Sequence, residues 1–220
     1  MTRRSTDALI RELRGELTPV RRIPPLRVVA VAIAALAVPG WVWMLVRSGG
    51  PRPDFVALAT TNPVFAAIGV GLAAFGIGGA LAAAALAVPG RVRTARAALW
   101  LTAIGAVLAF AVGPLWLAAA GPSALHGPTA VDLRCLLRSL AVGWVSSLAG
   151  VAFGWWAAPR HLALTAALAA AAGAAIGALS VHLVCPAPDA LHWLFGHAGA
   201  PVLAALSVLP IVAAIGRMRR

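Results

Sequence analysis

The sequence predicts an all-α membrane protein: six transmembrane helices, a short cytoplasmic amphipathic helix at the N-terminus, and both termini in the cytoplasm. Three observations predict this class. Hydrophobic residues make up 61% of the 220-residue chain, charged residues only 11%, and the mean hydropathy is +0.92. The apolar residues form six long blocks, and a helix needs about 20 mostly apolar residues to cross a bilayer. The arginines gather in the tails and in alternate connections between the blocks.

The N-terminal segment, residues 1–25, is predicted to stay in the mature protein as a cytoplasmic helix and basic linker. It is charged, and the apolar block after it is too long for the hydrophobic region of a signal peptide. Leu9, Leu13 and Leu17 recur at helical spacing with Ile10 alongside, which indicates an amphipathic helix of about 12 residues. Such a helix is marginal alone in water. It therefore needs a surface: the groove of a partner, the protein's own cytoplasmic face, or lipid headgroups.

The six apolar blocks form one predicted transmembrane domain, residues 26–216, followed by a short tail, 217–220. The connections between the blocks are short and rich in Gly and Pro, so none of them can hold a folded domain. The predicted spans cover residues 26–46, 64–88, 97–120, 136–157, 161–184 and 191–216.

Orientation is predicted from the arginines, which supply all 18 basic residues. With six spans, 14 of them fall on the side of the two termini and 4 on the other side, the latter being Arg47, Arg52, Arg134 and Arg138. Short cytoplasmic loops carry the excess of positive charge, so both termini are predicted to be cytoplasmic. Because the arginines are divided among short loops and tails, the sequence pI near 12 does not predict direct nucleic-acid binding.

The spans are rich in small residues and poor in polar ones. Gly173 and Gly177 form a GxxxG motif, which fits either a homodimer face or close packing within one chain; small residues in every span favour the second. Intramembrane carboxylates, which ion and proton pathways usually need, are nearly absent. Arg138 lies near the outer end of a span and is expected to snorkel or to pair with Asp132.

Reactive side chains concentrate in "SVHLVCPAPDALHWLFGH", residues 180–197, which holds one of two cysteines and three of five histidines. The predicted topology places Cys185 at the outer end of the fifth span and Cys135 at the outer start of the fourth. A four-residue turn joins these spans, which have similar lengths and should pack antiparallel. The two sulfurs are therefore expected to meet at a solvent-reachable outer rim.

Three interpretations of this cluster remain open: a redox-sensing pair of Cys135 and Cys185, a metal site, and a static disulfide or two buried thiols. The candidate metal ligands are His182, Cys185, His192 and His197. The redox pair is preferred, because a lone histidine on an apolar face is usually a hydrogen-bonded packing residue, and we expect neither a catalytic residue nor a bound cofactor or metal. Trp193 is expected in the interfacial aromatic belt.

Three segments together resemble the NrsF family of bacterial inner-membrane anti-sigma factors. They are "DALIREL" with "TPVRRIPP" before the first span, "DLRCLLRSL" at the fourth, and "HLVCPAPDALHWLFGH" between the fifth and sixth. The resemblance implies a non-enzymatic regulator that sequesters an extracytoplasmic-function sigma factor and releases it under periplasmic redox or metal stress. It also implies that Cys135 and Cys185 sense that stress. The residues it implies for sigma-factor binding are Asp7, Leu9, Ile10, Leu13, Arg14 and Leu17.

Two other functions fit the composition less well. A membrane thiol oxidoreductase would use the same cysteines, but the chain lacks a C-x-x-C pair and a quinone-site signature. A small six-helix transporter would need polar groups within the spans, and these are scarce.

Overall fold

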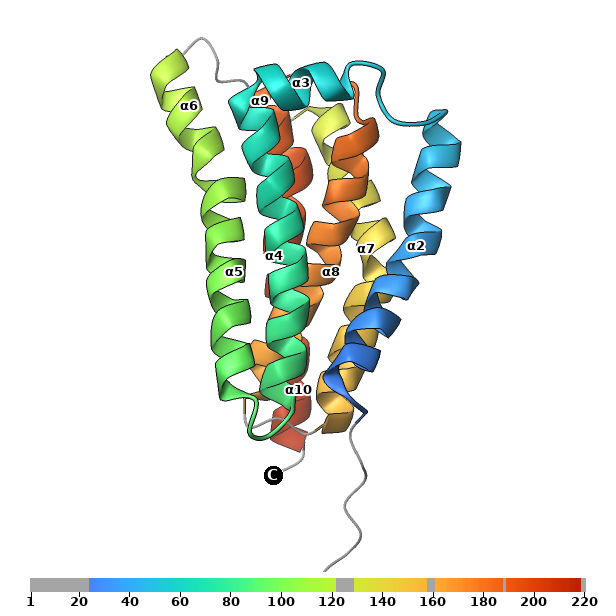
Figure 1. Ribbon diagram of the computed structural model, residues 1–220, viewed down its shortest axis with the longest axis vertical. Helices are drawn as coiled ribbons and strands as arrows, with labels where there is room; N and C mark the ends of the chain where they lie inside the picture. The colour runs from blue at the N-terminus through green and yellow to red at the C-terminus, as the bar shows by residue number, and fades with distance from the viewer. Residues whose placement is uncertain (1–23, 122–128, 158–160, 188, 219–220) are drawn as a thin grey trace, which may run out of the picture.

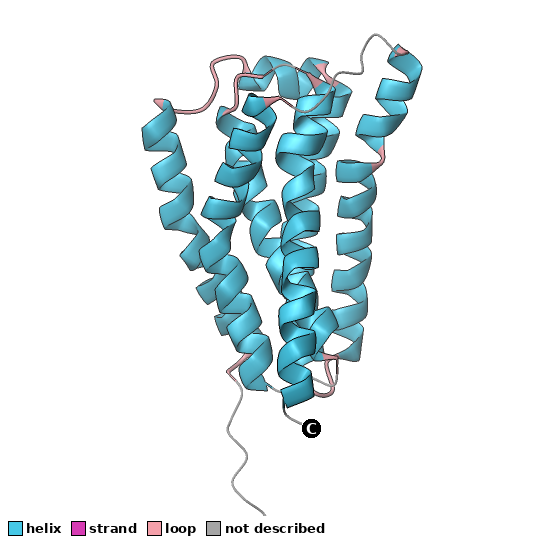
Figure 2. Ribbon diagram, turned by 180° about the vertical axis from the view of Figure 1, so that it is seen from behind, coloured by secondary structure: helices cyan, strands magenta, loops and turns pink. Residues whose placement is uncertain are grey.

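The computed structural model describes residues 24–121, 129–157, 161–187 and 189–218, which form a bundle of long helices (Figure 1). The described residues contain no strand (Figure 2). The elements are α2 (Leu26–Ser48), α3 (Phe55–Thr61), α4 (Pro63–Ala87), α5 (Val92–Phe110), α6 (Val112–Ala120), α7 (Ala130–Ala157), α8 (Leu162–Val184), α9 (Ala190–His192), the π-helix η2 (Trp193–Ala198) and α10 (Gly199–Met218).

Five helical segments among the described residues are long and apolar enough to cross a membrane, as predicted for five of the six spans. They are Pro63–Ala87, Val92–Ala119, Ala130–Ala157, Leu162–Val184 and Ala190–Ala214. The first predicted span coincides with α2, a helix of 23 residues, and the count of six spans remains a prediction. The predicted N-terminal helix lies outside the described residues.

Helix α8 is the centre of the bundle, because its small side chains let other helices approach its backbone. It packs against α2, α4, α7 and α10. A Cβ added at Gly177 would lie 2.6 Å from the Gly143 nitrogen of α7, and one added at Gly173 would lie 2.5 Å from the Ser147 nitrogen. The GxxxG motif therefore serves packing within one chain, as the sequence favoured.

The two ends of the bundle are formed by different turns and helix ends. The start of α2, the turn between α4 and α5, and the C-terminal end of α10 lie at one end (Figure 1). At the other end, α3 lies across the bundle (Figure 1) and packs against α4. The described chain thus enters and leaves the bundle at the same end, which is the arrangement that six spans require.

Local sequence signals fix the connections at the second of these ends. Helix α2 ends at Gly49, which has φ 73°, a left-handed conformation that favours glycine. Asn62 begins α4 as its N-cap, because its side-chain oxygen accepts hydrogen bonds from the Val64 and Phe65 amides. Pro63 follows at the first helical position, where its missing N–H costs nothing. These signals hold the 49–62 connection over the end of the bundle.

Candidate thiol–imidazole site

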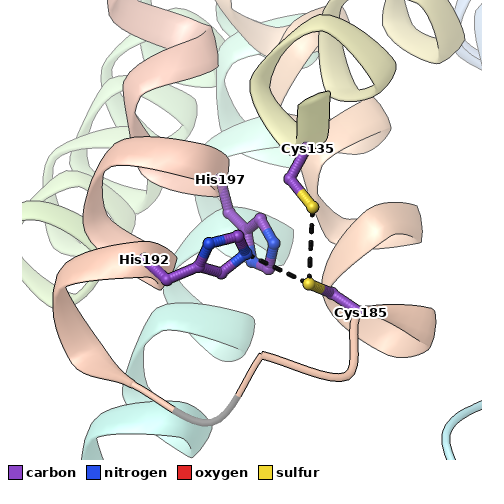
Figure 3. Close-up of side chains that lie close together, drawn as sticks. All are labelled: Cys135, Cys185, His192 and His197. Carbon is purple, nitrogen blue, oxygen red and sulfur yellow. Dashed lines mark hydrogen bonds between the residues drawn. The ribbon is translucent and has the colours of Figure 1, made fainter. Parts of the chain in front are cut away.

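The two cysteines lie together, as the sequence predicted, where the first turns of α7 meet the end of α8. The Sγ atoms of Cys135 and Cys185 are 3.4 Å apart, and both cysteines are free thiols (Figure 3). Helix α7 begins at Ala130, before the predicted start at residue 136, so Cys135 faces α8 from within a regular helix. Exposure of the two residues is only 5% and 3%, and the expectation of a solvent-reachable rim is therefore wrong.

His192 and Asp132 extend the thiol pair into a hydrogen-bonded chain. The Nε2 atom of His192 is 3.1 Å from the Cys185 sulfur, and its Nδ1 atom is 2.5 Å from Oδ1 of Asp132. The other oxygen of Asp132 accepts hydrogen bonds from the backbone amide and hydroxyl of Thr129, which fixes the carboxylate. Asp132, His192 and Cys185 are all buried. Arg138 was expected either to snorkel or to pair with Asp132; Arg138 is exposed, and Asp132 pairs with His192.

His197 approaches the sulfurs from the same side, and His182 holds it there. The Nδ1 atoms of His197 and His182 are 2.9 Å apart, and Nε2 of His182 is 3.1 Å from the Phe65 carbonyl oxygen. The His182 ring also stacks on Phe65, with centroids 4.1 Å apart. Both ring nitrogens of His182 are thus engaged, so this histidine supports the cluster from outside. One donor atom from each of Cys135, Cys185, His192 and His197 lies within 4.8 Å of all the others.

The acceptors at the far ends of these chains determine where each imidazole carries its proton. A carbonyl oxygen only accepts, so Nε2 of His182 donates to Phe65, and its Nδ1 then accepts from Nδ1 of His197. The remaining lone pair of His197 is on Nε2, which is buried and has no hydrogen-bond partner among the described residues. In the same way, Nδ1 of His192 donates to Asp132 and its lone pair on Nε2 faces Cys185.

The π-helix η2 brings His192 and His197 to the same face. Residues five apart lie about 140° apart around an α-helix, because each residue turns by about 100°. A π-helix has hydrogen bonds between residues five apart, so its turn nearly aligns them. The two imidazole centroids are accordingly 5.1 Å apart. Glycine at position 196 allows the His192 ring to approach this closely, because a Cβ there would make a tight contact of 3.3 Å with Cε1 of His192.

Arg52, on the connection between α2 and α3, holds the backbone that follows α8. Its guanidinium donates to the Cys185 carbonyl at 2.6 Å and forms a bidentate pair with Asp54 at 2.6 and 2.9 Å. This pairing lowers the pKa of Asp54. The Arg52 amide also donates to the Leu183 carbonyl at 3.0 Å. Arg52 was expected only as an outer-side charge; in the structure it is buried against Cys185, with 7% exposed.

The hydrogen bond that the Cys135 thiol donates lowers the pKa of the Cys185 thiol, while burial acts in the opposite direction. Trp193, expected at the lipid interface, is instead buried beneath the site: it is 1% exposed and donates its indole N–H to the Ala187 carbonyl. The predicted partner-binding residues, from Asp7 to Leu17, lie outside the described residues.

These features define the class of the protein: a helical membrane protein with a closed thiol–imidazole cluster at one end of its bundle, away from the end where the described chain begins and finishes. A family model described as "Negative regulator of sigma F" matches residues 13–217. The chain therefore belongs to the NrsF family, and its function is negative regulation of a sigma factor. The chain shows no significant similarity to a curated protein or to a solved structure.

Proposed function

We propose that this protein is a bacterial inner-membrane anti-sigma factor that holds an extracytoplasmic-function sigma factor at the cytoplasmic face and releases it when chemistry at Cys135 and Cys185 changes on the periplasmic side. The observation that carries this proposal is the placement of the thiol pair. The pair lies at one end of the bundle, and the described chain begins and finishes at the opposite end. The chain also belongs to a family of sigma-factor regulators.

The contact between α7 and α8 offers a route from the thiols to the other end of the bundle. The two helices bear the cysteines and stay in close contact along their length. The Ser147 hydroxyl donates to the Ala170 carbonyl at 2.9 Å, and Gly154 faces Thr165 further along. Packed interfaces of this kind shift between discrete arrangements and do not deform continuously. Release requires the two chemical states of the thiols to differ in sigma-factor affinity, and about 1.4 kcal/mol gives a tenfold effect.

Capture of a sigma factor tests the regulator assignment. The full-length protein, affinity-tagged and purified from its own membranes, is expected to bring down an extracytoplasmic-function sigma factor. The change Leu13→Asp places a charge on the apolar stripe of the predicted N-terminal helix and should abolish capture. Glu12→Gln, on the polar side of the same helix, should leave it unchanged. Capture that survives deletion of residues 1–17 would contradict docking through this helix.

Compartment assignment has a separate test. Both native cysteines are replaced by serine, and a single cysteine is introduced at an exposed site, either Ser48→Cys near the thiol end or Thr94→Cys near the opposite end. A membrane-impermeant maleimide applied to intact cells should label the first variant only, and should label the second after permeabilisation. The reverse pattern would place the thiol cluster in the cytoplasm and exclude periplasmic sensing.

Sensing is tested with the same capture assay. Mild oxidation of membranes with diamide is expected to lower the amount of captured sigma factor. Cys135→Ser and Cys185→Ser should each make capture insensitive to diamide, because a single thiol cannot form the intramolecular disulfide. Unchanged sensitivity in both variants would remove the thiol pair from the mechanism.

A further inference from the structure

We propose that Cys135, Cys185, His192 and His197 form a tetrahedral binding site for a soft or borderline divalent cation such as Zn²⁺. The proposal names the ligand class of the sensing site and rests on the proposed function only for its link to sigma-factor release.

The spacing of the four donor atoms fits one ion. A tetrahedral zinc site has Zn–S bonds of about 2.3 Å and Zn–N bonds of about 2.0 to 2.1 Å, which places neighbouring ligand atoms about 3.3 to 3.8 Å apart. The two sulfurs are 3.4 Å apart, and the Cys185 sulfur is 3.1 Å from Nε2 of His192. All four donor atoms lie within 4.8 Å of one another. Shifts of about 1 Å or less would therefore close the tetrahedron.

The chemistry of the donors selects the metal class. Two thiolates and two imidazoles suit zinc and other soft or borderline cations, whereas magnesium and calcium prefer oxygen ligands. Binding replaces the protons of the two thiols: M²⁺ and two Cys–SH give a bis-thiolate complex and two released protons, while both histidines bind as neutral imidazoles. Two thiolates and one divalent cation sum to zero charge. A neutral complex suits a site whose four ligand residues are each at most 5% exposed.

The hydrogen bonds behind the ligands fit metal binding more closely than they fit a thiol pair alone. Metal-bound histidines usually donate their other ring N–H to a carboxylate, carbonyl or similar acceptor. His192 donates to Asp132, and His197 donates to His182, which is anchored in turn on the Phe65 carbonyl. In both hydrogen-bonded series, the Nε2 lone pair of the ligand histidine, His192 or His197, is left directed at the other ligands. A disulfide between the cysteines would need neither imidazole in this orientation.

An independent observation is the unpartnered nitrogen of His197. Its Nε2 atom is buried, in a residue with 0% exposure, and has no hydrogen-bond partner among the described residues. A buried polar atom without a partner costs about 1 to 3 kcal/mol. Coordination to a metal ion would satisfy this lone pair.

Cobalt binding provides the test, because Co²⁺ occupies zinc sites and reports their geometry by its absorption. The full-length protein is purified in detergent with a phosphine reductant and titrated with Co²⁺. We expect one ion per chain, the intense visible bands of tetrahedral Co²⁺, a thiolate-to-cobalt charge-transfer band, and displacement by Zn²⁺. Cys135→Ser, Cys185→Ser and His197→Ala should each weaken binding by at least about 100-fold.

His161→Ala is the matched control, because His161 is an exposed histidine outside the ligand group. It should bind Co²⁺ as the unsubstituted protein does. The unsubstituted protein decides the matter even if a ligand variant misfolds: an octahedral spectrum, or no bound Co²⁺ while both thiols are reduced, would overturn the proposal.

Sigma-factor capture, with and without Zn²⁺, separates this proposal from the proposed function. Tetrahedral Co²⁺ binding without any captured sigma factor would support the metal site and contradict the proposed function. Captured sigma factor without Co²⁺ binding would support the proposed function and contradict the metal site.

Discussion

Replacing Gly177 by alanine tests whether close contact between α7 and α8 holds the two thiols together. The new Cβ would lie 2.6 Å from the Gly143 nitrogen and 2.9 Å from the Gly143 Cα, and still closer to the Ser139 carbonyl oxygen. These are backbone atoms, which cannot rotate away as a side chain could. To bring the nitrogen contact from 2.6 Å to an ordinary 3.4 Å, the helices must separate by at least about 0.8 Å at this level, and the closer contact with the Ser139 carbonyl oxygen requires more.

The expected loss of stability follows from two opposing effects. Overpacking a close-packed interior costs about 1 to 3 kcal/mol, and backbone clashes fall at the upper end. Alanine is favoured over glycine within a helix by about 1 kcal/mol. Gly177→Ala should therefore lower the free energy of unfolding by about 2 kcal/mol. Gly199→Ala is the control, because its Cβ would have no neighbour closer than 3.7 Å; that variant should be as stable as the unsubstituted protein or about 1 kcal/mol more stable.

The assay combines thermal unfolding in detergent with the rate at which diamide links Cys135 to Cys185. Gly177 lies two helical turns before Cys185, so separation at this glycine should also move the sulfurs apart and slow disulfide formation. Gly199→Ala should leave that rate unchanged. If Gly177→Ala unfolds at the same temperature as the control and forms the disulfide at the same rate, the inferred coupling between helix packing and the thiol pair is wrong.

Three further predictions concern the support of the site. Asp132→Asn keeps the shape of the side chain but weakens the hydrogen bond that orients His192, and it should lower Co²⁺ affinity by about 10- to 100-fold in the titration described above. Arg52→Gln removes the charge-assisted hydrogen bond to the Cys185 carbonyl, and thermal unfolding should show a free energy of unfolding lower by about 1.5 to 3 kcal/mol. Arg52→Lys should not restore this stability, because lysine cannot form the bidentate pair with Asp54. Deletion of Phe195, which is exposed, should convert η2 to α-helix and leave the two histidines four residues apart, about 40° apart on one helix face, so the tetrahedral Co²⁺ spectrum should persist. Loss of the spectrum would show that the π turn itself is needed to place the ligands.

The sequence was sufficient to predict the pairing of the two cysteines. A short turn between two apolar blocks of similar length favours an antiparallel helix pair, and residues at the matching ends of such a pair lie at the same height. The close packing at Gly173 and Gly177 was predictable for a similar reason, since only small residues allow the backbones of two helices to approach. Both predictions depend on chain length and residue size alone.

His192 and His197 were among the candidate metal ligands, but how they are brought together could not be predicted, because it depends on departures from regular geometry. "HWLFGH" places two histidines five residues apart, which on an α-helix would point them in different directions. The π turn that aligns them has no recognised signature in this segment, although Gly196 permits the close contacts inside it. Asp132 was considered only as a partner of Arg138, six residues further along its own helix. Its actual partner, His192, is 60 residues away and becomes a neighbour only through the packing of η2 against α7.

A metal ion and a disulfide would compete for the same two sulfurs, and the proposed sensor would work through this competition. A bound cation withdraws both thiolates from oxidation, while a disulfide removes both anionic ligands and leaves two neutral imidazoles that hold a cation weakly. The protein would therefore respond to loss of the metal, to oxidation, or to replacement of the metal by a larger soft cation. Each of these events would change the distance between the two sulfurs, and with it the spacing of α7 and α8 at the same point. If oxidation and metal binding act through this shared distance, Zn²⁺ at saturation should slow diamide-driven disulfide formation; equal rates with and without Zn²⁺ would mean that the thiols and the cation do not share a site.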